Sequence, residues 1–254
     1  MKLSHLHDTM MTIAICVLFA GLASSCSTSD SVSSKKTVDD IYSAGKKAFD
    51  DGNYLEAQAQ FDVIKLQYPA SQYADDAQYY TAEINFERGE YIMAAFNYNQ
   101  VRRSYPSSDF VRESMFKAAK CYEKIALPAD RDQENTRKAI QAYTDFQALY
   151  VRDTLTLEAS KRIRELRDRL AERFWLIADH YLLTLSRKAA MIHLDAIIDE
   201  YPDTKWFEPA LVKKIEILID LKRTDEARAA IAAYRRTIKQ PQQQSVVDQL
   251  ERGL

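Results

Sequence analysis

The sequence predicts an all-α fold, a superhelical solenoid of five helix pairs, and three observations lead to it. First, a motif recurs after 37 residues: Gly52-Asn53-Tyr54, Ala57, Phe61 and Tyr68-Pro69 return as Gly89-Glu90-Tyr91, Ala94, Tyr98 and Tyr105-Pro106. Second, apolar residues within each copy are three or four positions apart, as on one face of an α-helix. Third, no run of residues has the alternation typical of a strand.

The motif continues along the chain in a constant frame. Aligned on their alanines, the five units have Ala57, Ala94, Ala139, Ala190 and Ala227 in equivalent positions, separated by 37, 45, 51 and 37 residues. Repeats of this length are stacked supersecondary units, because one helix pair cannot bury its apolar face without neighbours. We refer to this alignment as the repeat frame.

Each unit is predicted to be two helices joined by a turn. In the first unit, Gly52 follows the first helix, where a residue free to adopt positive φ ends a helix at little cost. Pro69 ends the second helix. The first helices of the other units agree in the repeat frame, with bulky residues at Tyr42, Tyr79, Phe116 and Trp175 and small ones at Gly45, Ala82, Ala119 and Ala178.

This pattern of glycine-aromatic turn, small residue, aromatic and terminal proline resembles the tetratricopeptide repeat, which recurs about every 34 residues. Here the stride is 37 residues, and Val151 stands where a proline would follow Tyr150. The resemblance implies tetratricopeptide-like pairs with longer helices.

Two units are longer than the others. Between the helices of the third unit, residues 127–134 are polar and contain Pro128, which predicts an exposed loop. In the fourth unit, apolar residues from Ile163 to Tyr181 follow helical spacing without a breaker, which predicts a first helix of nearly thirty residues. This helix should join three N-terminal pairs, residues 37–151, to two C-terminal pairs, residues 152–240. Residues 241–254 are expected to form a polar C-terminal tail.

The N-terminus has the pattern of a lipoprotein signal peptide over residues 1–25. Lys2 precedes an apolar run from Met10 to Ala20, and small residues lead to Cys26. The segment Leu22-Ala23-Ser24-Ser25-Cys26 resembles a bacterial lipobox, which implies that Cys26 carries lipid. A membrane-spanning anchor is the alternative, but the run is shorter than the roughly 20 apolar residues a span needs. The Ser-rich residues 26–36 are predicted to be a flexible tether.

The residues expected for catalysis or for a cofactor are absent from the sequence. Its five glycines form no phosphate-binding loop, and His180 and His193 belong to no zinc-binding motif. Cys121 is expected to be a buried apolar residue. The net charge of −2, with both signs interspersed, predicts no nucleic-acid binding. We therefore expect no enzyme activity, no cofactor and no metal site.

The signal peptide, tether and repeats together resemble the BamD family of outer-membrane lipoproteins. The most specific segments are residues 130–133 leading into Arg137–Tyr150, residues 166–171, and Asp199–Thr204. The resemblance implies a scaffold of the β-barrel assembly machinery, lipid-anchored in the outer membrane and facing the periplasm. Implied partners are a BamA-like barrel insertase, outer-membrane protein precursors and other lipoproteins of the assembly complex.

The resemblance also suggests two sets of binding residues. The N-terminal units would offer a groove to precursors, with the candidates Tyr42, Lys46, Tyr79, Asn85 and Arg88. The C-terminal units would dock onto the insertase, with the candidates Arg164, Arg167, Arg173, Lys213 and Lys214. Both sets have a structural alternative. Aromatic residues at repeat positions usually pack in the core, and a charged helix face is usually exposed to solvent without binding a partner.

Two other functions remain open on sequence. A different lipid-anchored repeat adaptor of the cell envelope, in cell-wall synthesis or type IV pilus assembly, would share the lipid and the repeats. A helical hydrolase is disfavoured because no catalytic constellation is visible. The identity of the partners separates these alternatives.

Overall fold

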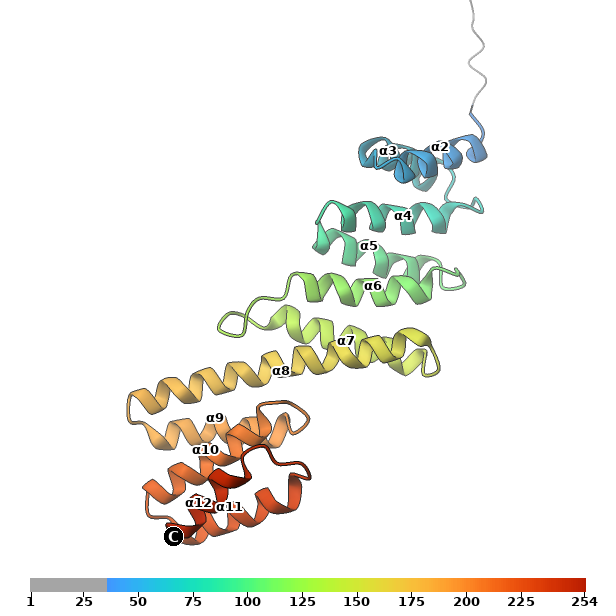
Figure 1. Ribbon diagram of the computed structural model, residues 1–254. Coiled ribbons are helices and arrows are strands. Elements are labelled where there is room, and N and C mark those ends of the chain that lie inside the picture. The colour runs from blue at the N-terminus through green and yellow to red at the C-terminus, as the bar shows by residue number, and fades with distance from the viewer. Residues whose placement is uncertain (1–35) are drawn as a thin grey trace, which may run out of the picture.

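The computed structural model describes residues 36–254, and this part of the chain contains eleven α-helices and no strand. Cys26, the signal peptide of residues 1–25 and the tether up to residue 35 lie outside the described residues. The predicted all-α fold is confirmed (Figure 1).

Ten of the helices form five antiparallel pairs, and the eleventh closes the C-terminal end. The pairs are α2 (Val38–Asp50) with α3 (Tyr54–Gln67), α4 (Ala74–Glu87) with α5 (Tyr91–Ser104), α6 (Val111–Lys124) with α7 (Glu134–Leu149), α8 (Thr154–Leu183) with α9 (Arg187–Glu200), and α10 (Phe207–Asp220) with α11 (Thr224–Thr237); α12 (Gln244–Arg252) follows.

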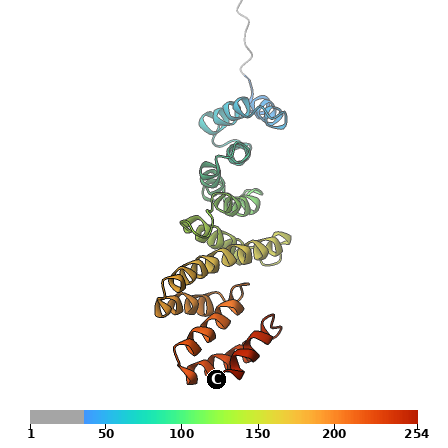
Figure 2. The same ribbon diagram turned by 60° about the vertical axis from the view of Figure 1, so that its left-hand side comes forward.

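The pairs are stacked one after another into an elongated, twisting array rather than around one centre (Figures 1 and 2). Most helix contacts are between neighbours in the chain. The contacts α2–α4 and α6–α8, between first helices of successive pairs, are exceptions. Each pair therefore completes its core with the next pair, as expected for a solenoid.

The repeat frame is preserved in the core. Ala57, Ala94, Ala139, Ala190 and Ala227 are all fully buried, as are the frame-equivalent large residues Phe61, Tyr98, Tyr143 and Leu194. The small residues Gly45, Ala82, Ala119 and Ala178 are also buried, on the first helices. Small side chains at these positions let paired helices approach closely, while the large residues four positions later fill the space between them.

The turns within the pairs repeat the same backbone conformation. Gly52 and Gly89 both have φ of +74°, and at the same repeat position Leu185 and Lys222 have φ of 58° and 57°. At Gly52 the turn is closed by hydrogen bonds from the amide of Gly52 to the carbonyl of Phe49, 3.0 Å, and from that of Asn53 to Ala48, 2.8 Å. This is the Schellman C-cap that glycine favours. The predicted glycine turn is confirmed, and two other pairs make the same turn without glycine.

The predicted long helix is present as α8, with 30 residues. Asp153 caps its start by accepting a hydrogen bond from the amide of Leu155 at 2.8 Å. Arg112 at the start of α6 donates hydrogen bonds to the same carboxylate, which ties α8 to the third pair. Towards its other end α8 packs against α9, so one continuous helix joins the third and fourth pairs (Figure 1).

Two segments are more ordered than the sequence suggests. The loop between α6 and α7 folds around Gln133, which is only 1% exposed, so the expectation of an exposed loop is only partly correct. The polar tail contains helix α12, because Val247 is fully buried and packs with Leu250 against a core cluster of α10 and α11.

Candidate protein-binding surfaces

A seam of polar contacts joins the first helices of successive pairs. Between α2 and α4, the hydroxyl of Tyr42 donates a hydrogen bond to Asp76 at 2.8 Å. Between α6 and α8, Arg162 lies 3.3 Å from the carboxylate of Glu123. Polar contacts of this kind recur between successive first helices from α2 to α8, on one side of the array. We call it the first-helix face.

The centre of this seam, between α4 and α6, is partly buried. Lys117 donates hydrogen bonds to both oxygens of Glu83, each at 2.7 Å, and to the hydroxyl of Tyr79 at 3.1 Å. The hydroxyl of Tyr98 donates to Glu83 from the opposite side. Burial and the nearby carboxylate of Glu83 raise the pKa of Tyr98, so the phenol stays protonated as a donor. These groups satisfy one another and hold the second and third pairs together.

Of the two predicted groove tyrosines, Tyr79 belongs to the core. Its side chain is 5% exposed and stacks on Phe110 with ring centroids 4.2 Å apart. Tyr79 therefore cannot contact a ligand in this conformation, and its place in the predicted groove is corrected. Tyr42 is half-buried and stacks on Tyr73, also at 4.2 Å, so it lies at the edge of the first-helix face.

The other three groove candidates lie nearer to solvent. The ammonium group of Lys46 pairs with Asp50 and lies 5.3 Å from the ring centre of Tyr80 on α4. Asn85 is half-buried, and its amide donates to the carbonyl of Thr81 at 2.7 Å. Arg88 is exposed at the end of α4 and pairs with Glu90 at 2.9 Å.

Two of the docking candidates on α8 brace the array internally. Arg167 forms a bidentate pair with Asp203, with Nε 2.8 Å from Oδ2, and donates to the carbonyl of Glu200 at 2.8 Å. The hydrogen bonds from Arg167 to its carboxylate lower the pKa of Asp203 below its usual value. Arg173 donates to the loop carbonyl of Arg131 at 2.7 Å. Both arginines therefore fix loops onto α8, which is a structural role that sequence spacing did not reveal.

The two docking candidates on α10 are also paired. Lys214 lies 2.7 Å from Asp195 on α9, and Lys213 lies 2.5 Å from Glu216 on its own helix. Arg164 differs from them, because it is exposed and no carboxylate of the described residues lies within ion-pair distance of it. Arg164 and Arg173 are thus the two candidates without an ion pair within residues 36–254, and Arg173 instead donates hydrogen bonds to loop carbonyls.

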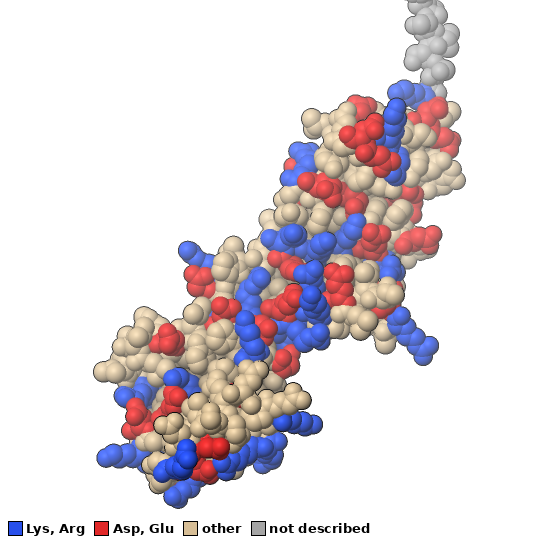
Figure 3. Space-filling view, viewed as in Figure 1, with Lys and Arg blue, Asp and Glu red and all other residues tan. Residues whose placement is uncertain are grey.

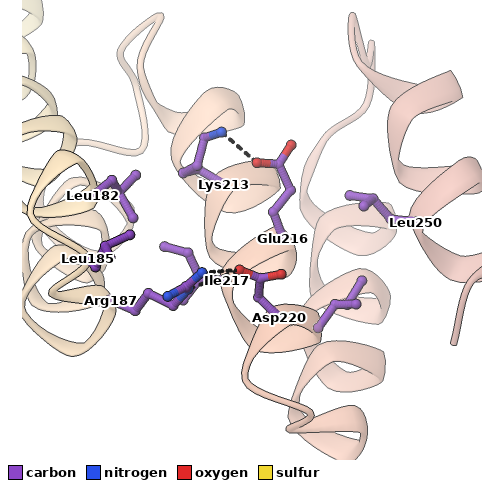
Figure 4. Close-up of a pocket in the computed structure, with 9 residues that line it drawn as sticks. Leu182, Leu185, Arg187, Lys213, Glu216, Ile217, Asp220 and Leu250 are labelled. Carbon is purple, nitrogen blue, oxygen red and sulfur yellow. Dashed lines mark hydrogen bonds and ion pairs between the residues drawn. The ribbon is translucent and has the colours of Figure 1, made fainter.

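A surface pocket of about 420 Å³ lies between the α8–α9 turn, α10 and α12. Leu182 and Leu185 form one wall and Leu250 lies opposite, with two ion pairs between them, Lys213 with Glu216 and Arg187 with Asp220 (Figure 4). Apolar walls with charges of both signs at the rim suit a protein side chain better than a small charged ligand. No sequence pattern indicates this pocket, because its walls come from three elements far apart in the chain.

Sequence reasoning also missed Gln133. Its amide nitrogen donates to the carbonyls of Pro128 at 2.6 Å and Arg131 at 3.1 Å, and its amide oxygen accepts from the hydroxyl of Thr136 at 2.8 Å. A buried glutamine at the end of a polar segment has no sequence signal that distinguishes it from a solvated one.

Reactive and metal-binding groups are scarce in the described part. Cys121 is buried as expected, and burial raises the pKa of its thiol to about 12. The ring of His193 stacks on Tyr181 with centroids 5.6 Å apart. Across residues 36–254, no three His, Cys, Asp or Glu side chains are grouped so as to hold a metal ion.

Charges of both signs lie side by side over the face that Figure 3 shows. None of the helices from α2 to α12 has the length and apolar character required to cross a bilayer.

Comparisons with known proteins agree with these features. The family model described as YfiO, outer membrane lipoprotein, matches residues 34–233. The outer membrane protein assembly factor BamD of Caulobacter vibrioides is 24% identical over 228 residues, which cover 89% of this chain and 75% of that protein.

Among solved structures, the chain is similar to two tetratricopeptide repeat proteins. The TPR2AB domain of yeast Sti1, solved in complex with pHSP90, is 15% identical with a TM-score of 0.45, over 85% of this chain and 97% of that one. A thermophilic tetratricopeptide protein of Thermus thermophilus is 16% identical with a TM-score of 0.37, over 84% of this chain and 97% of that one.

The family match spans all five helix pairs except the last residues of α11. It begins two residues before the described part of the chain. This chain therefore belongs to the YfiO family of outer membrane lipoproteins.

Proposed function

We propose that this protein is a non-enzymatic, lipid-anchored scaffold that takes part in assembling β-barrel proteins in the outer membrane. The observation that carries the proposal is the YfiO family match over residues 34–233, with a relative named as an outer membrane protein assembly factor. An elongated array with polar contacts along its first helices and a separate pocket between α8, α10 and α12 suits a protein that holds several partners at once.

Anchoring is assigned to Cys26, the final residue of the lipobox-like segment. A buried acyl chain contributes about 0.8 kcal/mol per CH₂ group, so several chains on one residue hold a protein firmly at a membrane. With the lipid in the outer membrane, the helix pairs would lie in the periplasm.

Precursors of barrel proteins are assigned to the first-helix face of α2 and α4. An unfolded chain loses conformational freedom on binding, so a preformed surface must gather many modest contacts along it. Lys46 lies one turn after Tyr42 on α2, and Asn85 and Arg88 lie in the last part of α4, all three with side chains at least partly accessible. Tyr79 supports the face from the core.

A BamA-like insertase is assigned to the C-terminal half, along α8 and at the pocket between the α8–α9 turn, α10 and α12. Arg164 is free to pair with an acidic group of the partner. The pocket between Leu185 and Leu250 can accept an apolar side chain (Figure 4). Other lipoproteins of the assembly complex are further partners in this proposal.

Site-specific photo-crosslinking in cells tests both assignments. A photoreactive amino acid at Arg164 should capture an outer-membrane barrel with periplasmic domains, and one at Arg88 should capture barrel precursors. Lys138 on the outward side of α7 is exposed and serves as the control position, where we expect neither product. Capture of cell-wall synthesis or pilus-assembly proteins instead would contradict the proposal.

The anchor has its own test. Cys26→Ser should move the protein from the membrane to the soluble fraction, because none of the helices α2 to α12 can hold it in the bilayer as a span. Membrane association that survives this substitution would contradict acyl anchoring at Cys26.

A further inference from the structure

The second helices of the first two pairs carry large apolar side chains on their outward sides. On α3, Leu55 and Leu66 are 75% and 81% exposed. On α5, Ile92, Met93 and Phe96 are 70%, 52% and 54% exposed. A helix packed on one side normally presents polar residues on the other. These two helices differ, because they carry large apolar residues on their exposed sides as well as on their packed sides.

The exposed residues form two stripes in matching positions. On α3 the stripe runs through Leu55, Ala59 and Leu66, and on α5 the equivalent positions are Ile92, Phe96 and Arg103. Spacings of four and seven residues place each set on one side of its helix. Because α3 and α5 occupy the same place in successive pairs, both stripes lie on the same side of the array. We call them together the outward apolar face.

Only the two N-terminal pairs are apolar at both of the first two stripe positions. In the repeat frame, the residues equivalent to Leu55 and Ala59 are both polar on α7, where they are Arg137 and Gln141. On α9 they are Lys188 and Ile192, and on α11 they are Asp225 and Ala229, so each of these helices has one charged residue there. The repeat therefore does not need apolar residues at these positions. Their concentration in the first two pairs indicates that something covers this part of the array.

The place of the tether favours a membrane as the cover. Val38 at the start of α2 is twelve residues after Cys26. A chain of this length spans at most about 40 Å when fully extended. Acylated Cys26 would therefore keep the first pairs close to the bilayer, while the last pairs can lie much further away.

The charges beside the stripes agree with a lipid surface. Arg102 and Arg103 are exposed at the end of α5, and neither makes an ion pair within the described part of the chain. Of the acidic groups on α3, Asp62 is paired with Lys65 at 3.0 Å, and Glu56 accepts a hydrogen bond from Gln60. Exposed apolar residues with free arginines are the combination that binds at a headgroup layer.

We propose that the outward apolar face, with its large residues Leu55, Leu66, Ile92 and Phe96 and the adjacent Met93, rests in the headgroup layer of the membrane that holds the lipid anchor. The proposal rests on the anchoring part of the proposed function. Such a contact sets the orientation of the whole array, so that the first-helix face of α2 and α4 is held at a fixed angle to the membrane surface.

Fluorescence quenching by lipids tests the contact directly. Phe96→Cys and, as a matched control at the same repeat position, Gln141→Cys are labelled with an environment-sensitive fluorophore. Cys121 is buried and protonated, so it does not compete for the label. The lipidated proteins are reconstituted into vesicles of phosphatidylethanolamine and phosphatidylglycerol containing brominated acyl chains.

We expect a blue-shifted emission and at least about twofold stronger quenching at position 96 than at position 141. Leu55→Glu with Ile92→Glu should abolish the difference, while the protein still floats with the vesicles. Because both side chains are exposed, these substitutions leave the core intact.

Three results would overturn the proposal. Equal quenching at both positions in protein that floats would overturn this contact alone. A blue shift without quenching by brominated lipid would mean that protein covers the face. Failure of the unmutated protein to float would overturn the lipid anchor and, with it, the contact.

Discussion

At the scale of single residues, the turns show where the repeat is strained. Leu185 and Lys222 hold the left-handed backbone that Gly52 and Gly89 adopt freely. A residue with a Cβ atom in this region loses about 1–2 kcal/mol relative to a right-handed conformation. The turn is nevertheless kept, because the hydrogen bonds that close it are the same in all four pairs.

Replacing Lys222 with glycine should therefore stabilise the protein. Glycine relieves the backbone strain in the folded state. Its greater freedom in the unfolded chain takes back about 0.4–1 kcal/mol of this gain. We expect a net gain of about 0.5–1 kcal/mol in urea unfolding. Arg228→Gly, on an exposed helical position of α11, is the control and should lose about 1 kcal/mol. A loss of stability in Lys222→Gly would contradict the strained turn. A Gly52→Ala variant with the stability of the parent protein would contradict it as well.

The pair of Arg167 and Asp203 should make stability depend on pH. Because Arg167 lowers the pKa of Asp203 in the folded state, the pair stabilises the protein above the unfolded value near 3.8, and this is lost as pH falls through the lowered pKa. Both side chains are partly exposed, so we expect Asp203→Asn to lose roughly 0.5–1 kcal/mol at pH 7.

The difference between Asp203→Asn and the parent protein should shrink in unfolding measurements below pH 4. Asp225→Asn is the matched control, since Asp225 is fully exposed and its carboxylate comes no nearer than 3.9 Å to Arg228. A difference that stays constant from pH 7 to pH 3 would show that the Asp203 carboxylate has no special interaction.

Sequence reasoning located small and apolar residues well but assigned polar side chains poorly. The positions of Ala57 and Phe61 follow from local spacing, which the sequence contains. The partners of Arg173 and Lys214 lie on other elements, and long side chains reach partners that spacing does not indicate. For the same reason, Tyr79 could not be distinguished in advance from Tyr42.

At the scale of elements, the loop between α6 and α7 depends on one side chain. Gln133 holds the loop carbonyls from within, and Arg173 holds them from α8. Loop and helix are therefore coupled, although 40 residues separate Gln133 from Arg173 in the chain.

Gln133→Ala should free this loop. Leaving a buried carbonyl without its donor costs about 1–3 kcal/mol, so the variant should be less stable by an amount in this range. Limited proteolysis should cut residues 126–132 faster, while Gln141→Ala, at an exposed position on α7, should behave as the parent. An unchanged cleavage rate would show that Arg173 alone orders the loop.

The sequence predicted α8 correctly because helical spacing persists over its whole length. It did not predict α12, because this short helix is mostly polar, and of its residues only Val247 and Leu250 pack against the core, joined by Leu254 beyond its end. The capping of this segment is also non-local, since Glu208 on α10 accepts hydrogen bonds from the amides of Gln242 and Gln243 at 2.8 and 2.7 Å.

At the scale of the whole molecule, the array behaves as a row of neighbours. Helix contacts link elements close in the chain, so a local defect should disturb adjacent pairs and leave distant ones intact. Leu166 lies in the core where α8 meets the third pair and is 2% exposed.

Leu166→Ala should lose about 2–5 kcal/mol, because truncation of a buried leucine leaves a cavity. Hydrogen exchange should show weaker protection in α6–α8 and nearly unchanged protection in α2 and α3. Leu157→Ala on the same helix is the control, because Leu157 is 78% exposed and should change stability little. Equal loss of protection in all five pairs would contradict a nearest-neighbour array.

The most direct measurement of the proposed role is mass spectrometry of the proteins that copurify with the intact chain after extraction of membranes in mild detergent. A lipid-anchored scaffold of barrel assembly should recover an outer-membrane barrel with repeated periplasmic domains, and Cys26→Ser should reduce that recovery. Recovery of cell-wall synthesis or pilus-assembly proteins without such a barrel would contradict the role.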